Sequence, residues 1–584
     1  MAVENLITEH IDIWTSAVKT RSASGRGSSK KLELYGVKKL RELILELAVR
    51  GKLVPQNPND EPASVLLERI AAEKALLVKE KKIKKPKSLA PIEQDDISYR
   101  LPNGWAAARL GNICNKLTDG SHNPAKDAGL GYPMYSSQNV QFRKIDFSNP
   151  SRYVDEQDYQ KEHARTQVQS GDILLTIVGT LGRAAVVPED APDFVLQRSV
   201  AVIESALNSD FLTYFFAAPI CIKYFEEHGK GTAQKGIYLG KLSLMPVFVP
   251  PLKEQHRIVA KVDELMALCD QLEQQTEASI EAHQVLVTTL LDTLTNSANA
   301  DELMQNWARI SEHFDTLFTT EESIDQLKQA ILQLAVMGKL VPQDPSDEPV
   351  NKLLERIKNH QLDRVQRKEI QKPKKASVST KLKMDIPKCW KSLLLNDLVF
   401  VTKLAGFEYT KYINLEDAGD VAVIRAQNVR PFKPDLENLK FIDNETSLSL
   451  PRSAIDRPSL LVTFIGAGIG DVCVFNEEKR WHLAPNVAKI EPYADLNLEY
   501  LCIYLNSPVG RGELFKSMKS TAQPSLSMTT IREIWVALPP VDEQKRIVTE
   551  VNKLFTLCDQ LAVRLKASQV VQLHLTDVIA EQAV

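Results

Sequence analysis

The chain contains two copies of one long sequence unit. Residues 40–70, LRELILELAVRGKLVPQNPNDEPASVLLERI, recur at 327–357 as LKQAILQLAVMGKLVPQDPSDEPVNKLLERI. A second block, PPLKEQHRIVAKVDELMALCDQL at 250–272, recurs at 539–561 as PPVDEQKRIVTEVNKLFTLCDQL. The offsets are 287 and 289 residues, so nearly half of the 584-residue chain is duplicated with its internal order intact. A monomer with two similar halves can bind a ligand that also has two similar halves, and duplex DNA is the commonest such ligand.

The composition indicates an ordinary soluble protein of several domains, because 584 residues exceed what one core holds. The seven cysteines include no C-x-x-C pair, so neither a zinc ribbon nor another metal site nor a disulfide framework is expected. The beginning of the chain lacks the features of a signal peptide, and no apolar run reaches membrane-spanning length. We therefore expect a cytoplasmic protein without membrane contact. The net charge of -3 argues against indiscriminate coating of nucleic acid.

Each half of the chain is expected to contain a helix, a basic linker, a variable domain and a second helix. Helical spacing of Leu40, Leu43 and Leu47 predicts the first helix, which should end at Gly51 and restart at Ala63. The second copy is punctuated in the same way by Gly338 and by prolines. Two helical segments joined by a fixed turn are thus specified twice.

The linkers KEKKIKKPK and RKEIQKPKK precede the variable domains, and a solvated connector is favoured over a phosphate contact for them. A proline and tryptophan segment, LPNGW or IPKCW, opens each domain, and short β-branched runs such as DILLTIVG and LLVTFIG follow. The interiors therefore look mixed α/β. The predicted order is an N-terminal helical repeat region with linker, a first variable domain, a central helical repeat region with linker, a second variable domain and a C-terminal coiled-coil helix, at 1–100, 101–250, 251–385, 386–540 and 541–584.

An apolar seam with steps of four and three residues runs along the helix after each variable domain. Such spacing is typical of a coiled coil, and the two helices are expected to pack on each other antiparallel around an approximate two-fold axis. The seam residues are Ile258, Val262, Leu265, Cys269 and Leu272 in the first copy and Ile547, Val551, Leu554, Cys558 and Leu561 in the second.

With these motifs in view, the chain resembles the specificity (S) subunit of type I restriction-modification systems, the HsdS family. The resemblance rests on the LAV-x-GKLVPQ helix end, the P-x-G-W-like domain opening and PP-x-x-EQ-x-RI, which occurs twice. Cys389 replaces the usual glycine of the opening, which we interpret as a tolerated turn variant. The resemblance implies two α/β target recognition domains separated by long antiparallel coiled-coil helices. Each domain would read one part of a split double-stranded DNA site.

The resemblance also implies a non-catalytic role in defence against foreign DNA. The helices would bind two methyltransferase (M) subunits for adenine N6 methylation, and restriction (R) subunits would join for ATP-dependent cleavage. The chain has no [ND]-P-P-[YFW] methylation loop and no phosphate-binding G-x-x-x-x-G-K-[ST] loop. S-adenosylmethionine, ATP and magnesium are therefore assigned to the partners. Two rival hypotheses are a self-contained methyltransferase or nuclease, disfavoured by the missing motifs, and a helical scaffold whose domains bind protein.

Polar side chains of the variable domains are the candidates for DNA contact. Amides suit the edge of adenine, and cations suit guanine edges or phosphates. A buried amide that braces a loop is an equal alternative for the glutamine and asparagine pairs, because both copies share them. The candidates are Gln138, Asn139, Arg143, Lys144, Arg183, Lys230, Thr232, Gln234 and Lys235 in the first domain and Arg425, Gln427, Asn428, Arg430, Lys433, Lys519, Thr521 and Gln523 in the second.

Overall fold

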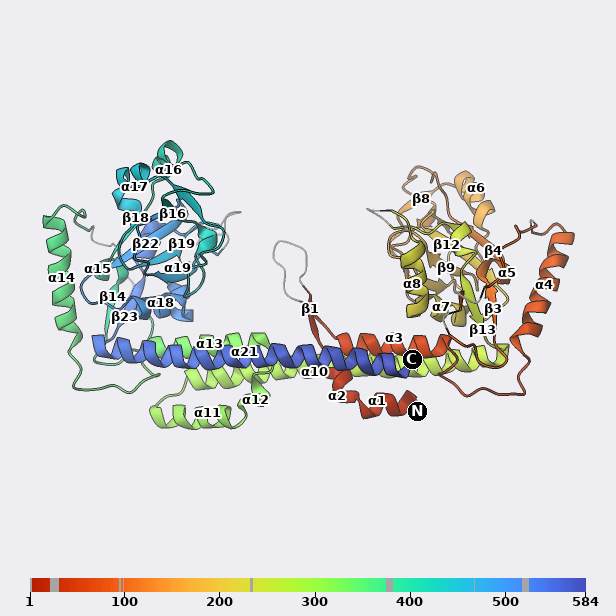
Figure 1. Cartoon of the computed structure of the whole chain (residues 1–584), viewed down its shortest axis with the longest axis horizontal. Coiled ribbons are helices and arrows are strands. Elements are labelled where there is room, and N and C mark those ends of the chain that lie inside the picture. Colours follow the sequence, from red (N-terminus) through yellow and green to blue (C-terminus); the bar gives the residue numbers. More distant parts are fainter. Residues whose placement is uncertain are drawn as a thin grey trace. The chain divides into compact units, whose positions relative to one another are not determined.

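The computed structural model describes residues 3–21, 31–83, 85–93, 96–97, 99–231, 235–373, 382–466, 468–516 and 525–584. The chain divides into two compact units. Unit 1 comprises residues 1–279 and 568–584, and unit 2 comprises residues 280–567. Each unit contains one copy of both repeated blocks and one variable domain (Figure 1). Within the described ranges, no helix combines the length and the apolar character needed to cross a membrane.

The first repeated block forms a helix, a turn and a second helix in both units, as the sequence predicts. Gly51 and Gly338 follow the first helix of this block with φ of 67° and 71°, which is left-handed backbone that favours glycine. A β-carbon at either glycine would also collide with Pro102 or Pro387, the proline that opens the variable domain. The helices are α3 (Tyr35–Val49) and α4 (Ala63–Lys79) in unit 1 and α13 (Glu321–Val336) and α14 (Val350–Gln366) in unit 2.

The variable domain of unit 1 contains a four-stranded antiparallel sheet of order β10-β9-β12-β4 and a three-stranded sheet of order β11-β5-β8, in which β11 and β5 are parallel. The pairs β13-β3 and β6-β7 complete it. The strands are β3 (Ala106–Arg109), β4 (Cys114–Asp119), β5 (Tyr132–Tyr135), β6 (Val140–Gln141), β7 (Lys144–Ile145), β8 (Arg152–Val154), β9 (Ile173–Thr176), β10 (Ala184–Val186), β11 (Val195–Leu196), β12 (Val200–Ser205) and β13 (Pro246–Val249). The helices are α5 (Leu110–Ile113), α6 (Glu156–Thr166), α7 (Ser209–Ala217), α8 (Pro219–His228) and α9 (Leu239–Leu242).

The variable domain of unit 2 repeats the order of the first sheet although its sequence has diverged, and its second sheet has one additional strand, β18. Its sheets are β20-β19-β22-β15, β17-β16-β21-β18 and β14-β23, and β16 and β21 are again parallel. The strands are β14 (Lys391–Leu394), β15 (Val399–Lys403), β16 (Val421–Ile424), β17 (Lys440–Ile442), β18 (Ala454–Ile455), β19 (Ser459–Thr463), β20 (Val472–Phe475), β21 (Trp481–Leu483), β22 (Val487–Pro492) and β23 (Trp535–Leu538). The helices are α15 (Leu395–Leu398), α16 (Gly406–Tyr412), α17 (Asn444–Ser449), α18 (Leu498–Asn506), α19 (Pro508–Phe515) and α20 (Met528–Arg532), with 3-10 turns at Ala426–Asn428 and Pro451–Ser453.

The predicted mixed α/β interior is confirmed, and its core lies on the central strands. The runs DILLTIVG and LLVTFIG form β9 and β19, and every residue of these two strands is buried. Such continuous apolar strands are covered on both faces, which is why they do not alternate with polar residues. In unit 1 α7 and α8 lie between the sheet and α3, and the backbone nitrogen of Ile220 in α8 donates to the carboxylate of Glu46 in α3 at 3.2 Å (Figure 1).

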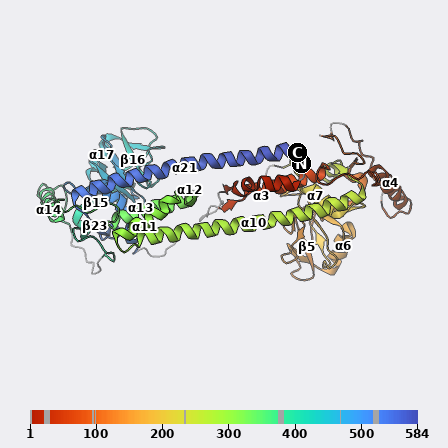
Figure 2. The same cartoon turned by 90° about the horizontal axis from the view of Figure 1, so that it is seen from below.

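Each unit also contains a bundle of three long helices. In unit 1, α3 lies between the first part of α10 (Leu252–Thr295) and the last part of α21 (Val541–Ala583) (Figure 2). Arg41 of α3 pairs with Asp270 and Glu273 of α10, and Tyr35 donates to Asp577 of α21 at 2.6 Å. The remaining elements are α1 (Val3–Glu9), α2 (Ile11–Ser16), the hairpin β1 (Lys19–Arg21) and β2 (Lys31–Glu33), α11 (Ala300–Glu312) and α12 (Phe314–Leu317).

The bundle of unit 2 shows the direction of its helices. Lys566 and Asp559 of α21 pair with Glu321 and Lys328 of α13, so these two helices run antiparallel. Gln284 and Thr288 of α10 instead bond Glu322 and Gln326 of α13, which makes α10 and α13 parallel. Within this unit α10 and α21 are therefore antiparallel, as predicted.

The predicted seam is buried at most positions, with Leu272, Leu554 and Leu561 half-buried. In unit 2 it joins one hydrophobic cluster with α13 and α10. The prediction lacked this third helix. The periodicity of one helix shows that the helix has an apolar face, but it does not show how many other helices pack against that face.

Candidate nucleic-acid interface

The motifs that repeat between the halves meet at one polar joint below each variable domain. In unit 2 Glu543, from the first turn of α21, is fully buried and accepts from Trp390 Nε1 at 2.9 Å. Its other oxygen accepts from Gln343 Nε2 at 2.6 Å. The next helical turn places Arg546 against Asp347 with two bonds of 2.9 and 2.6 Å. The PP-x-x-EQ-x-RI, GKLVPQ and tryptophan motifs are thus parts of one contact.

Unit 1 builds the same joint from the same residue types. Glu254 accepts from Trp105 Nε1 at 3.0 Å and from Gln56 Nε2 at 2.8 Å, and Arg257 pairs with Asp60 at 2.6 Å. Burial raises the pKa of the Glu254 carboxyl, although these two donors oppose the shift. Burial also raises the pKa of Glu543, against the hydrogen bonds from Trp390 and Gln343. Both joints therefore hold a carboxylate at a cost in desolvation, which the donated hydrogen bonds offset in part.

The glutamine of each PP-x-x-EQ-x-RI motif fixes the variable domain to the long helix. Gln544 is fully buried, donates to Pro539 O at 2.9 Å and accepts from Asn497 N at 3.1 Å. Gln255 makes the same pair of bonds with Pro250 and Asn208 in unit 1. The two asparagines are the N-caps of α18 and α7, so the joint orients the helices that cover each sheet.

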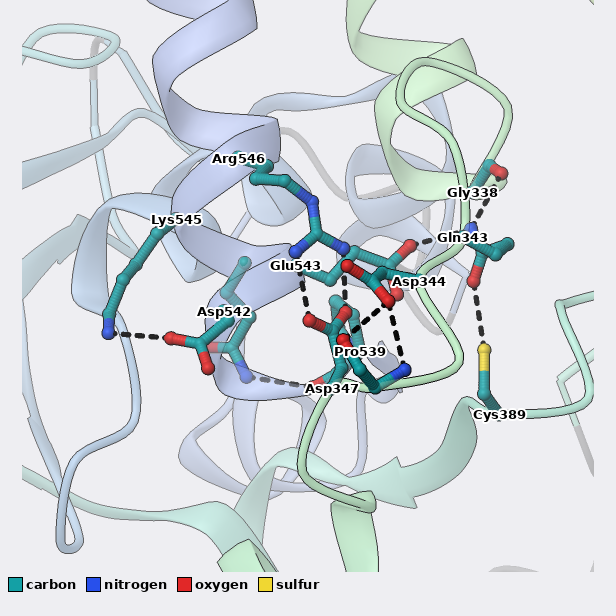
Figure 3. Close-up of polar contacts among 12 residues, drawn as sticks. Gly338, Gln343, Asp344, Asp347, Cys389, Pro539, Asp542, Glu543, Lys545 and Arg546 are labelled. Carbon is teal, nitrogen blue, oxygen red and sulfur yellow. Dashed lines mark hydrogen bonds and ion pairs between the residues drawn. The ribbon is translucent and has the colours of Figure 1, made fainter.

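Cys389 takes the position of the glycine in the first domain opening. Its thiol donates to Gln343 Oε1 at 2.8 Å (Figure 3), and burial raises its pKa. Trp390 keeps the same contact as Trp105, and β14 follows as β3 does. The interpretation of a tolerated turn variant agrees with this geometry.

A second joint connects each variable domain to its long helix, and here the two halves differ. Arg143, at the tip of the β6 and β7 hairpin, contacts Tyr214 and Asp263 and pairs with Asp210 at 3.1 Å. Asp263 belongs to α10. The guanidinium, proposed from sequence as a DNA contact, is therefore occupied by two acidic side chains and a tyrosine. In unit 2 Phe432 has the equivalent tip position and packs edge-on against Phe555 of α21, with ring centroids 5.4 Å apart.

The loops that follow the central strands of unit 1 are hydrogen-bonded to one another. Because β5 and β11 are parallel, the turns after them meet, and Ser137 N donates to Ser199 Oγ at 3.0 Å. Residue 177, after β9, bonds Ser199 O and also joins residue 237. The turn after β4 is held through Ser121, which donates to Leu196 O at 2.8 Å. We name the set of residues 119–122, 136–139, 177–183, 197–199 and 235–237 the loop edge of unit 1.

Unit 2 has the same loop edge with different side chains. The turns after the parallel strands β16 and β21 meet. Phe464, which follows β19, donates from its backbone nitrogen to Asn486 O at 3.0 Å. Leu526 N in turn donates to Phe464 O at 2.9 Å. We name residues 404–408, 425–428, 464–466, 468–470, 484–486 and 525–526 the loop edge of unit 2. A shared backbone scaffold thus presents two unlike sets of side chains.

Asn139 and Asn428 brace these loop edges in the same way. Asn139 is buried, accepts from Ser136 N at 3.0 Å and donates from Nδ2 to Asp146 O and Asn149 O. Asn428 accepts from Arg425 N at 3.1 Å and donates to the carbonyls of residues 435 and 437. Both N–H donors and the oxygen of each amide are therefore bonded inside the protein, which favours the loop-bracing alternative over base readout.

The other predicted residues lie in varied surroundings. Arg425 is half-buried and contacts Asn438 O, and Arg183 is half-buried beside Gly182. The exposed candidates are Gln138, Lys144, Lys230, Lys235, Gln427, Arg430 and Lys433. Thr232, Gln234, Lys519, Thr521 and Gln523 lie outside the described residues. The predicted set missed three exposed side chains of the unit 1 loop edge, His122, Thr180 and Arg198, although the turn-forming Asp-Gly at 119–120 could have marked the first.

Comparison with known proteins identifies the class of molecule to which these joints and loop edges belong. A family model described as the type I restriction modification DNA specificity domain matches residues 102–282 and again 387–568. The type I restriction enzyme EcoAI specificity subunit of Escherichia coli is 37% identical over 604 residues, and the EcoEI specificity subunit of the same species is 38% identical over 609. Both alignments cover 100% of each chain.

The chain belongs to the family of type I restriction-modification specificity subunits. The resemblance drawn from its repeated motifs is therefore confirmed. As a specificity subunit it is the non-catalytic, DNA-recognising component of such a system. Among solved structures, the HsdS subunit from Thermoanaerobacter tengcongensis matches with a TM-score of 0.38 and 16% identity, covering 83% of this chain and 98% of that chain.

Proposed function

We propose that this specificity subunit reads a bipartite double-stranded DNA site, with one loop edge assigned to each half-site. The observation that carries the proposal is the pair of loop edges. Both are built on the same strand order and the same asparagine brace, yet they present different side chains. Two domains that recognise different DNA sequences require a common scaffold with different contact residues, because the scaffold must be kept while the contact residues vary.

We further propose that two methyltransferase subunits dock on the helices that the duplicated blocks form. The repeat supports this assignment, since equivalent helices with equivalent joints offer two like surfaces to two like partners. The partners would carry out adenine N6 methylation in the cytoplasm with S-adenosylmethionine. Restriction subunits would add cleavage that depends on ATP and magnesium. In this proposal the present chain binds none of these cofactors itself.

Methylation mapping tests the proposal directly. The cognate methyltransferase subunit is expressed in a methylation-free host with and without this chain, and methyladenine is located by single-molecule sequencing. We expect a split motif, methylated on both strands, only when this chain is present. A purified complex that yields no motif would contradict the reading role and would support a scaffold that binds protein.

The spacer between the half-sites gives a second test. An inserted helical turn of four residues lengthens a helix by about 6 Å, which is close to two base pairs. We expect insertion of one turn into both α10 and α21 to change the tolerated spacer while both half-sites stay the same. An unchanged spacer would contradict the idea that the helices set it.

A further inference from the structure

One exposed histidine of unit 1 is held by a nearly buried carboxylate. His122 lies in the turn after β4, and its side chain is 55% exposed. Its Nε2 is 2.9 Å from Oδ2 of Asp119, whose side chain is 9% exposed. An ionised carboxylate only accepts hydrogen bonds, so the hydrogen of this contact belongs to Nε2. The contact fixes both the orientation of the ring and the nitrogen that carries the hydrogen.

Asp119 is itself fixed by a second partner. Arg165 of α6 donates to Asp119 Oδ1 at 2.5 Å and to the backbone oxygen of the same residue at 2.9 Å. In the tautomer that donates from Nε2 to Asp119, the acceptor nitrogen of the ring is Nδ1. Among the described residues, Nδ1 of His122 has no hydrogen-bond partner.

The backbone of this turn has little freedom to move. A β-carbon at Gly120 would overlap the carbonyl oxygens of Leu196 and Gln197, so the two loops approach as closely as glycine allows. Ser121 accepts from Arg198 N at 2.9 Å and donates from its hydroxyl to the buried Glu162 at 2.9 Å. An exposed side chain on such a fixed turn is preorganised for one ligand geometry.

We propose that His122 contacts a base of the first half-site and accepts, through Nδ1, a hydrogen bond from an exocyclic amino group. In the major groove such a donor is N6 of adenine or N4 of cytosine. Asp119 and Arg165 act as positioning residues for the ring. The inference rests on the proposed function, since it gives the loop edge of unit 1 one specific contact.

At the described positions that correspond to Asp119 and His122, the second half has no equivalent of this contact. Asp119 pairs with Ala201 in the sheet, and Lys403 pairs with the corresponding Ala488. Three residues further on, Gly406 occupies the position of His122 and begins α16. The contribution of His122 should therefore be confined to one half-site, which separates it from any general effect on the protein.

The test measures discrimination between bases by the complex of this chain with its methyltransferase subunit. Competition binding compares the mapped site with duplexes that carry single substitutions at each half-site position. His122→Ala should lower discrimination at one adenine or cytosine position of the first half-site by about tenfold, and Asp119→Asn should lower it less. Discrimination across the second half-site should stay unchanged. His313→Ala is the matched control, because His313 is also exposed but lies between α11 and α12, outside the loop edge and outside the repeated blocks.

Three results would overturn the inference. The first is full discrimination retained by His122→Ala at every position of the first half-site. The second is weaker binding to all sequences alike, which would indicate a phosphate contact. The third is loss of discrimination at both half-sites, which would indicate a structural role. If the wild-type complex shows no split motif, the proposed function itself fails, so the two failures are distinguishable.

Discussion

The two halves of this molecule are alike where a variable domain begins and ends, and unlike where its hairpin tip meets the long helix. The tryptophan joint has the same donors and the same acidic acceptor in both copies. The tip joint is an ion pair with Asp263 in unit 1 and an aromatic contact with Phe555 in unit 2. Packing geometry is thus retained even where the chemistry has changed. The sequence between the tryptophan joints can therefore vary while each variable domain stays attached to its long helix.

The largest expected effect comes from the shared joint. Trp105→Ala and Trp390→Ala remove indoles that are 8% and 3% exposed, and each should destabilise its own unit by about 3 to 5 kcal/mol. Hydrogen exchange in α7 and α18 measures the opening free energy of each unit. Trp105→Phe and Trp390→Phe, which lose the indole N–H but keep most of the ring, should cost only about 1 to 2 kcal/mol. If only one of the two tryptophan substitutions destabilised its unit, the two joints would not be equivalent.

A buried ion cluster distinguishes the halves more sharply. In unit 2 Arg364 donates to Glu491 at 2.6 Å, and Lys489 lies 2.6 Å from the same carboxylate. All three residues are at most 5% exposed. In unit 1 the equivalent positions of Arg364 and Lys489 are Leu77 and Val202. Arg364→Met should therefore destabilise unit 2 by about 3 kcal/mol, whereas Leu77→Met should have little effect on unit 1.

The same cluster predicts a difference in acid stability. Burial acts to raise the pKa of Glu491, but Lys489 and Arg364 outweigh it and the pKa is lowered. A lowered folded-state pKa adds stability above the unfolded value of about 4.3, and this stability is lost as the pH falls through the folded value. Wild-type unit 2 should lose more stability than Arg364→Met on acidification below about pH 4, measured by hydrogen exchange in α18. Parallel profiles of the two proteins would show that the cluster adds no acid sensitivity.

The sequence predicted the duplicated frame because each repeated motif residue has one local task. Gly51 ends a helix, Glu254 binds the tryptophan, and Ile258 enters the seam. Such tasks leave patterns of spacing that a single sequence displays. The tip joint could not be predicted, since Arg143 and Asp263 are 120 residues apart and an exposed arginine looks the same whether it meets DNA or an aspartate. His122 was missed because Arg165, which fixes its partner Asp119, lies on another element.

The asparagine braces offer a test of structure against readout in both halves. Asn139→Ala and Asn428→Ala leave two carbonyls and one backbone N–H without their partner and should each cost about 1 to 3 kcal/mol. The loss should appear in the opening free energy of the variable domain concerned, measured by hydrogen exchange. If either asparagine read adenine instead, its substitution would relax one position of the methylated motif without loss of stability.

The smallest expected effect is the contrast between the two hairpin tips. Arg143→Ala should weaken the contact of the tip with α10 by about 1 kcal/mol at low salt, because the pair is partly exposed. In 1 M salt the Debye length falls to about 3 Å, so this effect should shrink. Phe432→Ala should cost a similar amount that high salt does not reduce, since an apolar contact carries no charge to screen.

Hydrogen exchange at residues 140–145 and 429–434, at both salt concentrations, measures the two tips. An exchange of chemistry sharpens the comparison. Arg143→Phe combined with Met266→Phe copies the aromatic pair of unit 2 into unit 1, because Met266 occupies the position of Phe555 on α10. In this double variant, hydrogen exchange at residues 140–145 should no longer depend on the salt concentration, as expected for the tip of unit 2. If its tip stays as salt-sensitive as the wild type, screening of the Arg143 ion pair is not the source of the difference between the halves.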